Sequence, residues 1–187
     1  MRTTSQPANQ TTDVAGRPSG GSLTEISSIK ARIVYDSRSL PTLEVEVFVG
    51  DEFGRGGSPS GAQEARGVSD FRPNFSLMEQ ACEAVQMRLG PTLVGRDVTD
   101  QTASDNLLRD FRLSMIREGA GWERFTWAVS VAIARAAALV LKKEPYEHLA
   151  GVAGRNLGLV PILPVPMMNV INGGTVGDPS LAFKATL

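Results

Sequence analysis

The sequence predicts an α+β domain in which three antiparallel strands are followed by a layer of helices. Apolar residues recur at every second position over residues 42–49 and at helical spacing from residue 76 onward. Residues 124–142 are apolar on nearly all sides and rich in alanine, a composition typical of a central helix that its neighbours approach closely. Because the strands come first and the helices follow without alternation, the order favours an α+β architecture.

The three strands are expected between residues 29 and 57. Residues 29–35 suit the first strand, and turn residues follow it. In the second strand, residues 42–49, one face is apolar and the other carries Glu44 and Glu46, which indicates an antiparallel strand with one buried face. Residues 51–57 then indicate a hairpin connection into a short third strand.

Three helices are expected after the strands. Ser76 and Glu79 form a capping box at the start of the first helix, and the glycine–proline pair at residues 90–91 is expected to end it. Asp100 or Thr99 can cap the second helix. The apolar stripe of this second helix consists of Leu107, Leu108, Phe111 and Met115. The alanine-rich stretch forms the third helix.

Four single residues are expected to have no chemical role. Trp122 and Trp127 lie at the start of the alanine-rich helix, where core packing is expected. Cys82 is the only cysteine, so an intrachain disulfide and a cysteine-rich metal site are both excluded, and a packed thiol is expected. His148 is the only histidine. It is expected to be structural or on the surface, because a metal site needs several converging ligands.

The two ends of the chain differ from its middle. Residues 1–24 are rich in Ser, Thr, Gly, Pro and Gln and are expected to form a disordered tail. Residues 25–158 are expected to form the domain, and residues 159–187 a stiff proline-rich linker followed by a hairpin. Within that hairpin, residues 167–171 suit a buried strand and residues 181–187 its partner. Such a hairpin is too small to be stable alone, so a partner surface is expected.

Composition excludes several classes of function. The formal net charge of -1 argues against a general nucleic-acid or anionic-membrane binder, because little counterion release or surface attraction is available. No apolar stretch reaches the roughly 20 residues of a membrane span, and residues 1–24 lack the apolar region of a secretory signal. Together with the single cysteine, these features favour a reducing, cytoplasmic setting.

Four segments, taken in order, resemble the enolase family. Residues 36–47 (DSRSLPTLEVEV) resemble the family's opening DSRGNPTVEVEV, and residues 58–62 (SPSGA) resemble the start of its APSGAST loop. The alanine-rich helix and residues 145–149 (PYEHL) resemble the family's long helix and its LPLY terminus. Residues 163–174 (LPVPMMNVINGG) nearly match the family's LPVPMMNIINGG. On these motifs the chain is identified as a member of the family over residues 26–187.

The resemblance implies an architecture and a reaction. In enolases a three-stranded sheet and a helical layer pack against a larger β/α barrel. That barrel carries a lysine base, a glutamic acid and three carboxylates that hold Mg²⁺, and the enzyme converts 2-phosphoglycerate to phosphoenolpyruvate and water. In this chain the family pattern reaches only the opening hairpin of the barrel. We therefore expect no metal to be bound by this chain alone and no dehydration by it.

The loop that closes over the substrate in the family is also altered. Ser60, Gly61 and Ala62 match the family's SGA, and they are a remnant of this substrate loop. The second serine of SGAST, which completes the coordination of a second Mg²⁺ in the family, is replaced by Gln63, and several residues after it are missing. The resemblance therefore implies a shortened loop that does not coordinate metal.

Three further family positions near the end of the chain are changed. Relatives read INGGEHADNNLAFQEFM where this chain reads INGGTVGDPSLAFKATL. By this alignment Val176 replaces an active-site histidine, Lys184 a glutamine and Ala185 an acidic glutamate. Residues 181–183, which flank two of these positions, are retained. No catalytic residue is therefore expected to be intact, although Lys184 could hold an anion through its charge.

Partners follow from the same resemblance. Family enolases dimerise partly through this domain, with the arginine of the DSRGNPT motif and a glutamate of the next strand at the interface. Arg38 is retained, and Glu44 or Glu46 can supply the acid, so a homodimer or an enolase-type barrel partner is expected. The favoured reading is a degenerate, structural or regulatory relative. The alternatives are the N-terminal part of a split enzyme or of a truncated one, with divergent chemistry on a phosphoenolpyruvate-like or phosphonate substrate.

Overall fold

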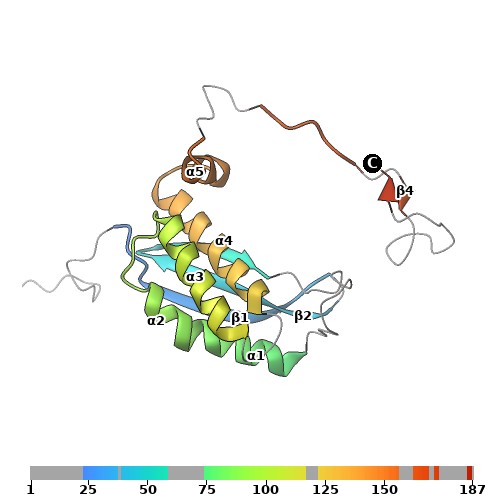
Figure 1. The fold of residues 1–187 in the computed structure, drawn as a ribbon. Helices are drawn as coiled ribbons and strands as arrows, with labels where there is room; N and C mark the ends of the chain where they lie inside the picture. Colours follow the sequence, from blue (N-terminus) through green and yellow to red (C-terminus); the bar gives the residue numbers. More distant parts are fainter. Residues whose placement is uncertain are drawn as a thin grey trace, which may run out of the picture. The chain divides into compact units, whose positions relative to one another are not determined.

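A computed structural model describes most of the middle of the chain (Figure 1). The described residues are 23–37, 39–58, 74–116, 122–155, 162–168, 171–172 and 185–186. The chain divides into two compact units, Met1–Arg155 and Asn156–Leu187. The strands and helices that form a hydrophobic core all belong to the first unit.

The first unit opens with the predicted antiparallel sheet. Its strands are β1 (Ser28–Tyr35), β2 (Pro41–Val49) and β3 (Glu52–Gly57), and β2 lies in the middle. Successive strands pair with no crossover, Ala31 lying opposite Val45 in the first pair. The inward-facing side chains of β2 are all buried: Leu43, Val45, Val47 and Val49. The predicted alternation is therefore confirmed.

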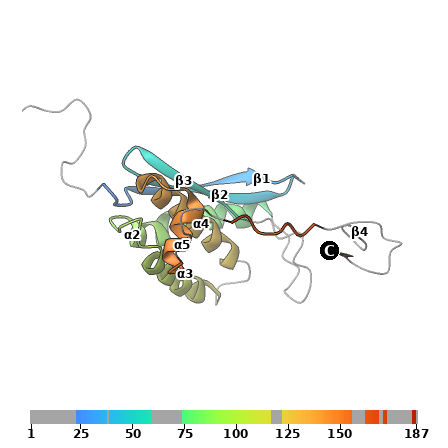
Figure 2. The same cartoon turned by 90° about the horizontal axis from the view of Figure 1, so that it is seen from above.

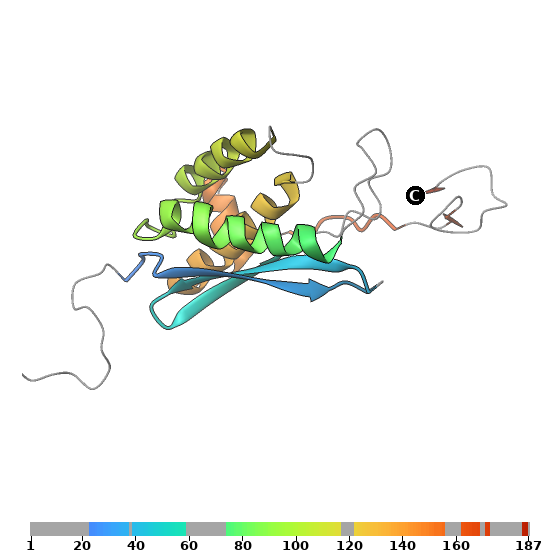
Figure 3. The ribbon, with the colours of Figure 1, turned by 90° about the horizontal axis from the view of Figure 1, so that it is seen from below.

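The helices all cover the same face of this sheet (Figures 2 and 3). The first is α1 (Phe75–Glu83), which begins two residues earlier than the capping box at Ser76 predicts. Asn74 is the cap, and its Oδ1 accepts a hydrogen bond of 2.8 Å from the Leu77 backbone N–H. Ser76 therefore lies in the first turn, because an asparagine two residues upstream performs the same task. Cys82 is partly buried against the core, and burial raises the pKa of its thiol.

The first helix does not end at the glycine–proline pair, so this prediction was wrong. A π-helical turn, η1 (Ala84–Leu89), continues directly into α2 (Gly90–Leu93). The Gly90 N–H donates to the Val85 carbonyl, five residues back. Pro91 lacks an N–H, and in an α-helix its ring would clash with the carbonyl four residues earlier. The wider turn before Pro91 avoids this conflict, so the chain stays helical through the proline.

Three more helices complete the first unit: α3 (Gln101–Ile116), α4 (Trp122–Val140) and α5 (Pro145–Val152). Of the two predicted caps for α3, Asp100 is the one used, since its Oδ1 accepts from the Ala103 N–H at 2.9 Å. Among the described residues, no single helix is both long and apolar enough to cross a membrane. The pair α4 and α5 passes that test together, but it is bent by 106°.

Trp127 is exposed, contrary to the prediction that it packs in the core. Its side chain is 66% exposed. The residue precedes Ala128 in α4, and one residue along a helix turns the side chain by about 100°. Ala128 faces the sheet and is fully buried, so Trp127 faces away from it. Trp122 begins α4, but its side chain lies outside the described part of the structure.

The contact between β3 and α4 is unusually close because neither partner has a large side chain there. Gly54 and Gly56 lie on the inner face of β3, and the row Ala128, Ala132 and Ala136 of α4 lies over them. A Cβ atom built on Gly56 would stand 2.0 Å from the Ala128 carbonyl oxygen. Backbone therefore packs directly on backbone at the centre of the domain.

The second unit contains little regular structure among its described residues. Residues 162–168 form no helix or strand and are exposed. Two short strands, β4 (Ile171–Asn172) and β5 (Ala185–Thr186), pair antiparallel as the predicted hairpin requires. Met167 and Met168 were predicted within a buried strand, but their side chains are 82% and 71% exposed. No second layer packs on them among the described residues of this unit, and a strand is buried only when another layer covers it.

Candidate functional site

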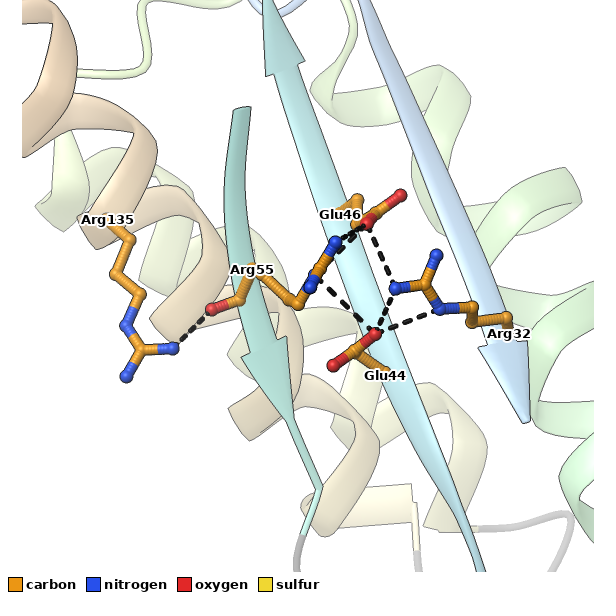
Figure 4. A network of polar contacts seen from close by, with 5 residues as sticks. All are labelled: Arg32, Glu44, Glu46, Arg55 and Arg135. Atoms are coloured by element: carbon orange, nitrogen blue, oxygen red, sulfur yellow. Dashed lines mark hydrogen bonds and ion pairs between the residues drawn. The ribbon is translucent and has the colours of Figure 1, made fainter. Parts of the chain in front are cut away.

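The outer face of the sheet carries a network of four charged side chains (Figure 4). The strand register brings them together, because Arg32 of β1 lies opposite Glu44 of β2, and Glu46 of β2 lies opposite Arg55 of β3. All four side chains point to the face that the helices do not cover, since alternate residues of a strand share a face. The network is therefore fixed by the register of three consecutive strands.

Both carboxylates of this network bind both guanidinium groups. Arg32 Nε donates to Glu44 Oε1 at 2.9 Å, and its Nη2 lies 3.1 Å from Glu46 Oε1. Arg55 Nη2 donates to Glu46 Oε1 at 2.6 Å, and its Nε lies 3.5 Å from Glu44 Oε1. Each acid thus has two cationic neighbours, and each arginine has two anionic ones. Such charge-assisted bonds are stronger than neutral ones.

The pKa of Glu46 shows that the network stabilises the ionised form of this carboxylate. The hydrogen bond from Arg55 lowers the pKa of Glu46 below its usual value, and the charges of Arg32, Arg55 and Lys30 act in the same direction against burial. The hydrogen bond to Glu44 raises the pKa of Arg32. Glu46 and Arg32 are therefore ionised near neutral pH, and Glu46 is not available as a proton donor.

Aromatic rings extend the network along the sheet. Phe48 and Phe53 lie opposite each other on β2 and β3, with ring centroids 5.5 Å apart. The Lys30 ammonium lies 4.9 Å from the Phe48 centroid, and the Arg55 guanidinium carbon lies 5.4 Å from the Phe53 centroid. At the far side of β3, Arg135 of α4 donates to the Arg55 carbonyl at 2.7 Å. The face is thus a mixed surface of charges and aromatic rings, which is the composition of many protein interfaces.

Of the residues predicted at a subunit interface, the structure describes two. Glu44 and Glu46 lie on the outer face, but each is already bound to arginines of its own chain. Arg38 lies outside the described residues. Arg32 and Arg55 were not singled out from the sequence. The signal for Arg32 was present, because Lys30 and Arg32 alternate on β1 in the same way as Glu44 and Glu46 do on β2.

The predicted substrate-loop remnant Ser60, Gly61 and Ala62, with Gln63, lies outside the described residues. The structure does describe the point from which this loop leaves. The Ser58 N–H donates to the Leu43 carbonyl at 2.8 Å, and the buried Thr42 hydroxyl donates to the Ser58 carbonyl at 2.7 Å. The loop therefore begins at a fixed position beside the middle strand.

The predicted positions near the end of the chain are described only in part. Val176 and Lys184 lie outside the described residues. Ala185 begins β5 and pairs with Asn172 of β4, while its side chain is not among those described.

The described residues do not fit the Mg²⁺ ion that the family resemblance implies. Mg²⁺ requires oxygen ligands in near-octahedral geometry, supplied by carboxylates and water. Among the described ranges, no group of three or more His, Cys, Asp or Glu side chains could hold a metal ion. Glu44 and Glu46 are close together, but guanidinium groups already bind the Oε1 atom of each. No step of a reaction can therefore be derived through a metal from these residues.

Comparison with known proteins agrees with the fold. A family model described as "Enolase, N-terminal domain" matches residues 26–149. An enolase of Solanum lycopersicum is 39% identical over 172 residues, covering 85% of this chain and 38% of that protein. An enolase of Kineococcus radiotolerans is 35% identical over 167 residues, covering 85% of this chain and 37% of that protein. This chain thus spans less than two-fifths of the length of either relative.

Proposed function

This chain belongs to the enolase family, matching the family's N-terminal domain, and from that premise we propose that it is a non-catalytic member with a structural or regulatory role. The family reaction dehydrates 2-phosphoglycerate to phosphoenolpyruvate. Under this proposal the chain does not perform that reaction by itself. Its single cysteine supports a reducing, cytoplasmic setting as part of the same proposal.

The observation that carries the proposal is the loss of chemical groups at matched positions. Val176 stands at a family histidine and Ala185 at a family glutamate, while flanking residues 181–183 are kept. Valine neither donates a hydrogen bond nor titrates, and alanine cannot polarise a hydroxyl. Gln63 stands where the family has a serine that completes a metal site. Enolase-superfamily sites depend on a base and on Mg²⁺ to stabilise the ene-diolate, so these changes act against the reaction directly.

A turnover assay tests this proposal. The purified chain is mixed with 2-phosphoglycerate and Mg²⁺, and the absorbance of the enol product is followed. No rate above the uncatalysed background is expected, because the substituted positions supply neither acid nor base. The tomato enolase under the same conditions is the positive control. Turnover by this chain alone would refute the proposal.

A second candidate is the N-terminal part of a longer or split enolase-family enzyme with divergent chemistry. It is favoured by the coverage, since 85% of this chain aligns with only 38% of the tomato relative. The distinguishing experiment adds a barrel-only piece of that relative to the chain. Turnover of 2-phosphoglycerate, or of a phosphonate analogue, in the mixture would support this second candidate, whereas an inactive mixture supports the first.

We further propose that the chain forms a homodimer through Arg38 and the outer face of the sheet. An incoming Arg38 would join the network around Glu44 and Glu46 rather than meet bare carboxylates, so its contribution is modest. Exposed ion pairs contribute about 0 to 1 kcal/mol each, and a two-fold dimer contains this contact twice. Arg38→Ala is therefore expected to weaken the dimer by up to about 30-fold. Sedimentation over a concentration series measures the dissociation constant.

The matched control for this experiment is Arg109→Ala. Arg109 lies on α3, on the helical side of the sheet, with its side chain exposed and 3.9 Å from Asp110. Its removal takes away the same charge without touching the outer face, so the dissociation constant is expected to stay unchanged. Equal effects of the two variants would mean that net charge, rather than a contact at Arg38, sets the association.

A further inference from the structure

The last helix of the first unit is held by one buried side chain, and that side chain can titrate. Of the eight residues of α5, only His148 is buried, with 5% of its surface exposed. The larger apolar side chains of α5 point outward: Tyr146, Leu149 and Val152 are all exposed. Since α5 packs on α4, its attachment depends on the packing of an imidazole.

The Nε2 side of the His148 ring has no compensation for a positive charge among the described residues. Its Nε2 atom is buried without a hydrogen-bond partner. Burying a neutral nitrogen without a hydrogen-bond partner costs much less free energy than burying an ion without a partner. The neutral ring is therefore compatible with the docked helix, and the protonated ring is not.

The charged groups around His148 do not change this conclusion. Lys143 precedes α5, and its positive charge disfavours a second one on His148. The two nearest acids in sequence are used by the helix cap, with Glu147 Oε2 accepting from the Glu144 N–H at 2.8 Å and the Glu144 side chain bound to the first turn. In the half of α4 nearest α5, residues 131–140, the only charged residue is Arg135, and it donates to the Arg55 carbonyl on β3.

We propose that α5 is a pH-sensitive latch, docked on α4 while His148 is neutral and released when His148 is protonated. The latch lies at a junction of the chain. α5 ends at Val152, and the second unit begins at Asn156. Release of α5 adds its eight residues to the connection between the two units, which lengthens their tether.

The direction and the window of this dependence follow from linkage. Burial, and then Lys143, lower the pKa of His148 below its ordinary value of 6.5. The released state therefore binds the proton more readily than the docked state. Docking is complete above about pH 6.5, and it weakens as the pH falls from there towards the lowered pKa of His148 in the docked state. The pKa values of Glu46 and Asp97 are also lowered. The stability that these two carboxylates contribute to the folded state is therefore lost only as the pH falls below their ordinary pKa values of 4.5 and 3.8. His148 is the only histidine, and imidazole is the side chain whose ordinary pKa lies between pH 7 and 5.

Amide hydrogen exchange of the full chain tests the latch. The opening constant of residues 145–152 is measured at pH 7 and pH 5 after correction for intrinsic exchange, with α3 as the internal reference. A released His148 of ordinary pKa 6.5 would raise that constant by up to about 25-fold. A rise of more than threefold, confined to α5, is expected. A smaller rise, or an equal rise in α3, overturns the proposal.

Two variants separate titration from general acid sensitivity. His148→Leu keeps an apolar group in the same place, so α5 is expected to stay protected at both pH values. If this variant opens at pH 5 as the natural chain does, the latch does not depend on His148 and the proposal fails. Lys143→Met removes the neighbouring cation. This variant is expected to raise the pH at the midpoint of the His148 titration, followed by the NMR resonance of its ring. An unchanged midpoint would contradict the placement of the Lys143 charge close enough to His148 to disfavour its protonation.

Discussion

Replacing Gly56 with alanine is expected to lower the free energy of unfolding by about 3 kcal/mol or more. A Cβ atom at this position would stand 2.0 Å from the Ala128 carbonyl oxygen and 2.8 Å from the Ala132 nitrogen. Both are backbone atoms of α4, so no side chain can rotate away to make room. The strand and the helix must instead separate along their whole contact, which loosens the central packing of the domain.

Gly54→Ala is expected to act in the same way, since its Cβ atom would stand 2.1 Å from the Ala132 carbonyl oxygen and 2.3 Å from the Ala136 nitrogen. The matched control is Gly57→Ala in the same strand, where a Cβ atom would meet nothing within 4 Å. That variant is expected to stay within about 1 kcal/mol of the natural chain, because alanine mainly restricts the unfolded state there. Urea unfolding followed by circular dichroism gives the midpoints. If Gly56→Ala and Gly57→Ala unfold at the same urea concentration, β3 and α4 do not pack as closely as described.

These glycines also show why the sequence predicts one side of this contact and not the other. The alanines of α4 indicate a helix that neighbours approach closely, and the structure agrees. Gly54 and Gly56 fall within a stretch that was interpreted as a hairpin connection and a short third strand. Glycine is favoured both in turns and where backbones meet. Sequence spacing cannot separate these two uses, because the second depends on a partner about 75 residues away.

The fold class was predictable because the spacing of apolar residues along the sequence indicates which side chains are buried. Val45 and Val47 alternate with Glu44 and Glu46, and the structure buries the first pair under the helices. The wrong predictions concern places where local signals compete. Pro91 normally ends a helix, but a π-helical turn before it allows the chain to continue. Trp127 was assigned to the core from its type, whereas its position beside Ala128 turns it outward.

The outer-face network was predictable only in part. The sequence places Glu44 and Glu46 on one face of β2, and this is confirmed. Their partners depend on register, because Arg32 meets Glu44, and Arg55 meets Glu46, only for one alignment of the three strands. A slip of one residue would move every side chain to the other face. The buried valines of β2 forbid that slip, so the core fixes the pairing of charges on the opposite face.

Leu108→Ala is expected to lower the free energy of unfolding by about 3 kcal/mol. Leu108 lies in α3, is 3% exposed and belongs to the hydrophobic core. Removing its side chain costs the transfer free energy of the lost atoms and leaves a cavity that close-packed neighbours fill only partly. The prediction also tests the stripe read from the sequence, since Leu108, Phe111 and Met115 are spaced so that they lie on one face of α3.

The matched control is the same substitution five residues along the same helix. Leu113 is 53% exposed, and five residues turn a helix by about 140°, which takes this side chain away from the core. Leu113→Ala is expected to change the free energy of unfolding by no more than about 0.5 kcal/mol, because alanine is at least as good a helix former and little buried area is lost. Thermal or urea unfolding of both variants gives the difference. Equal destabilisation would mean that α3 is rotated about its axis, and the face of α3 that packs on α4 would then have to be reassigned.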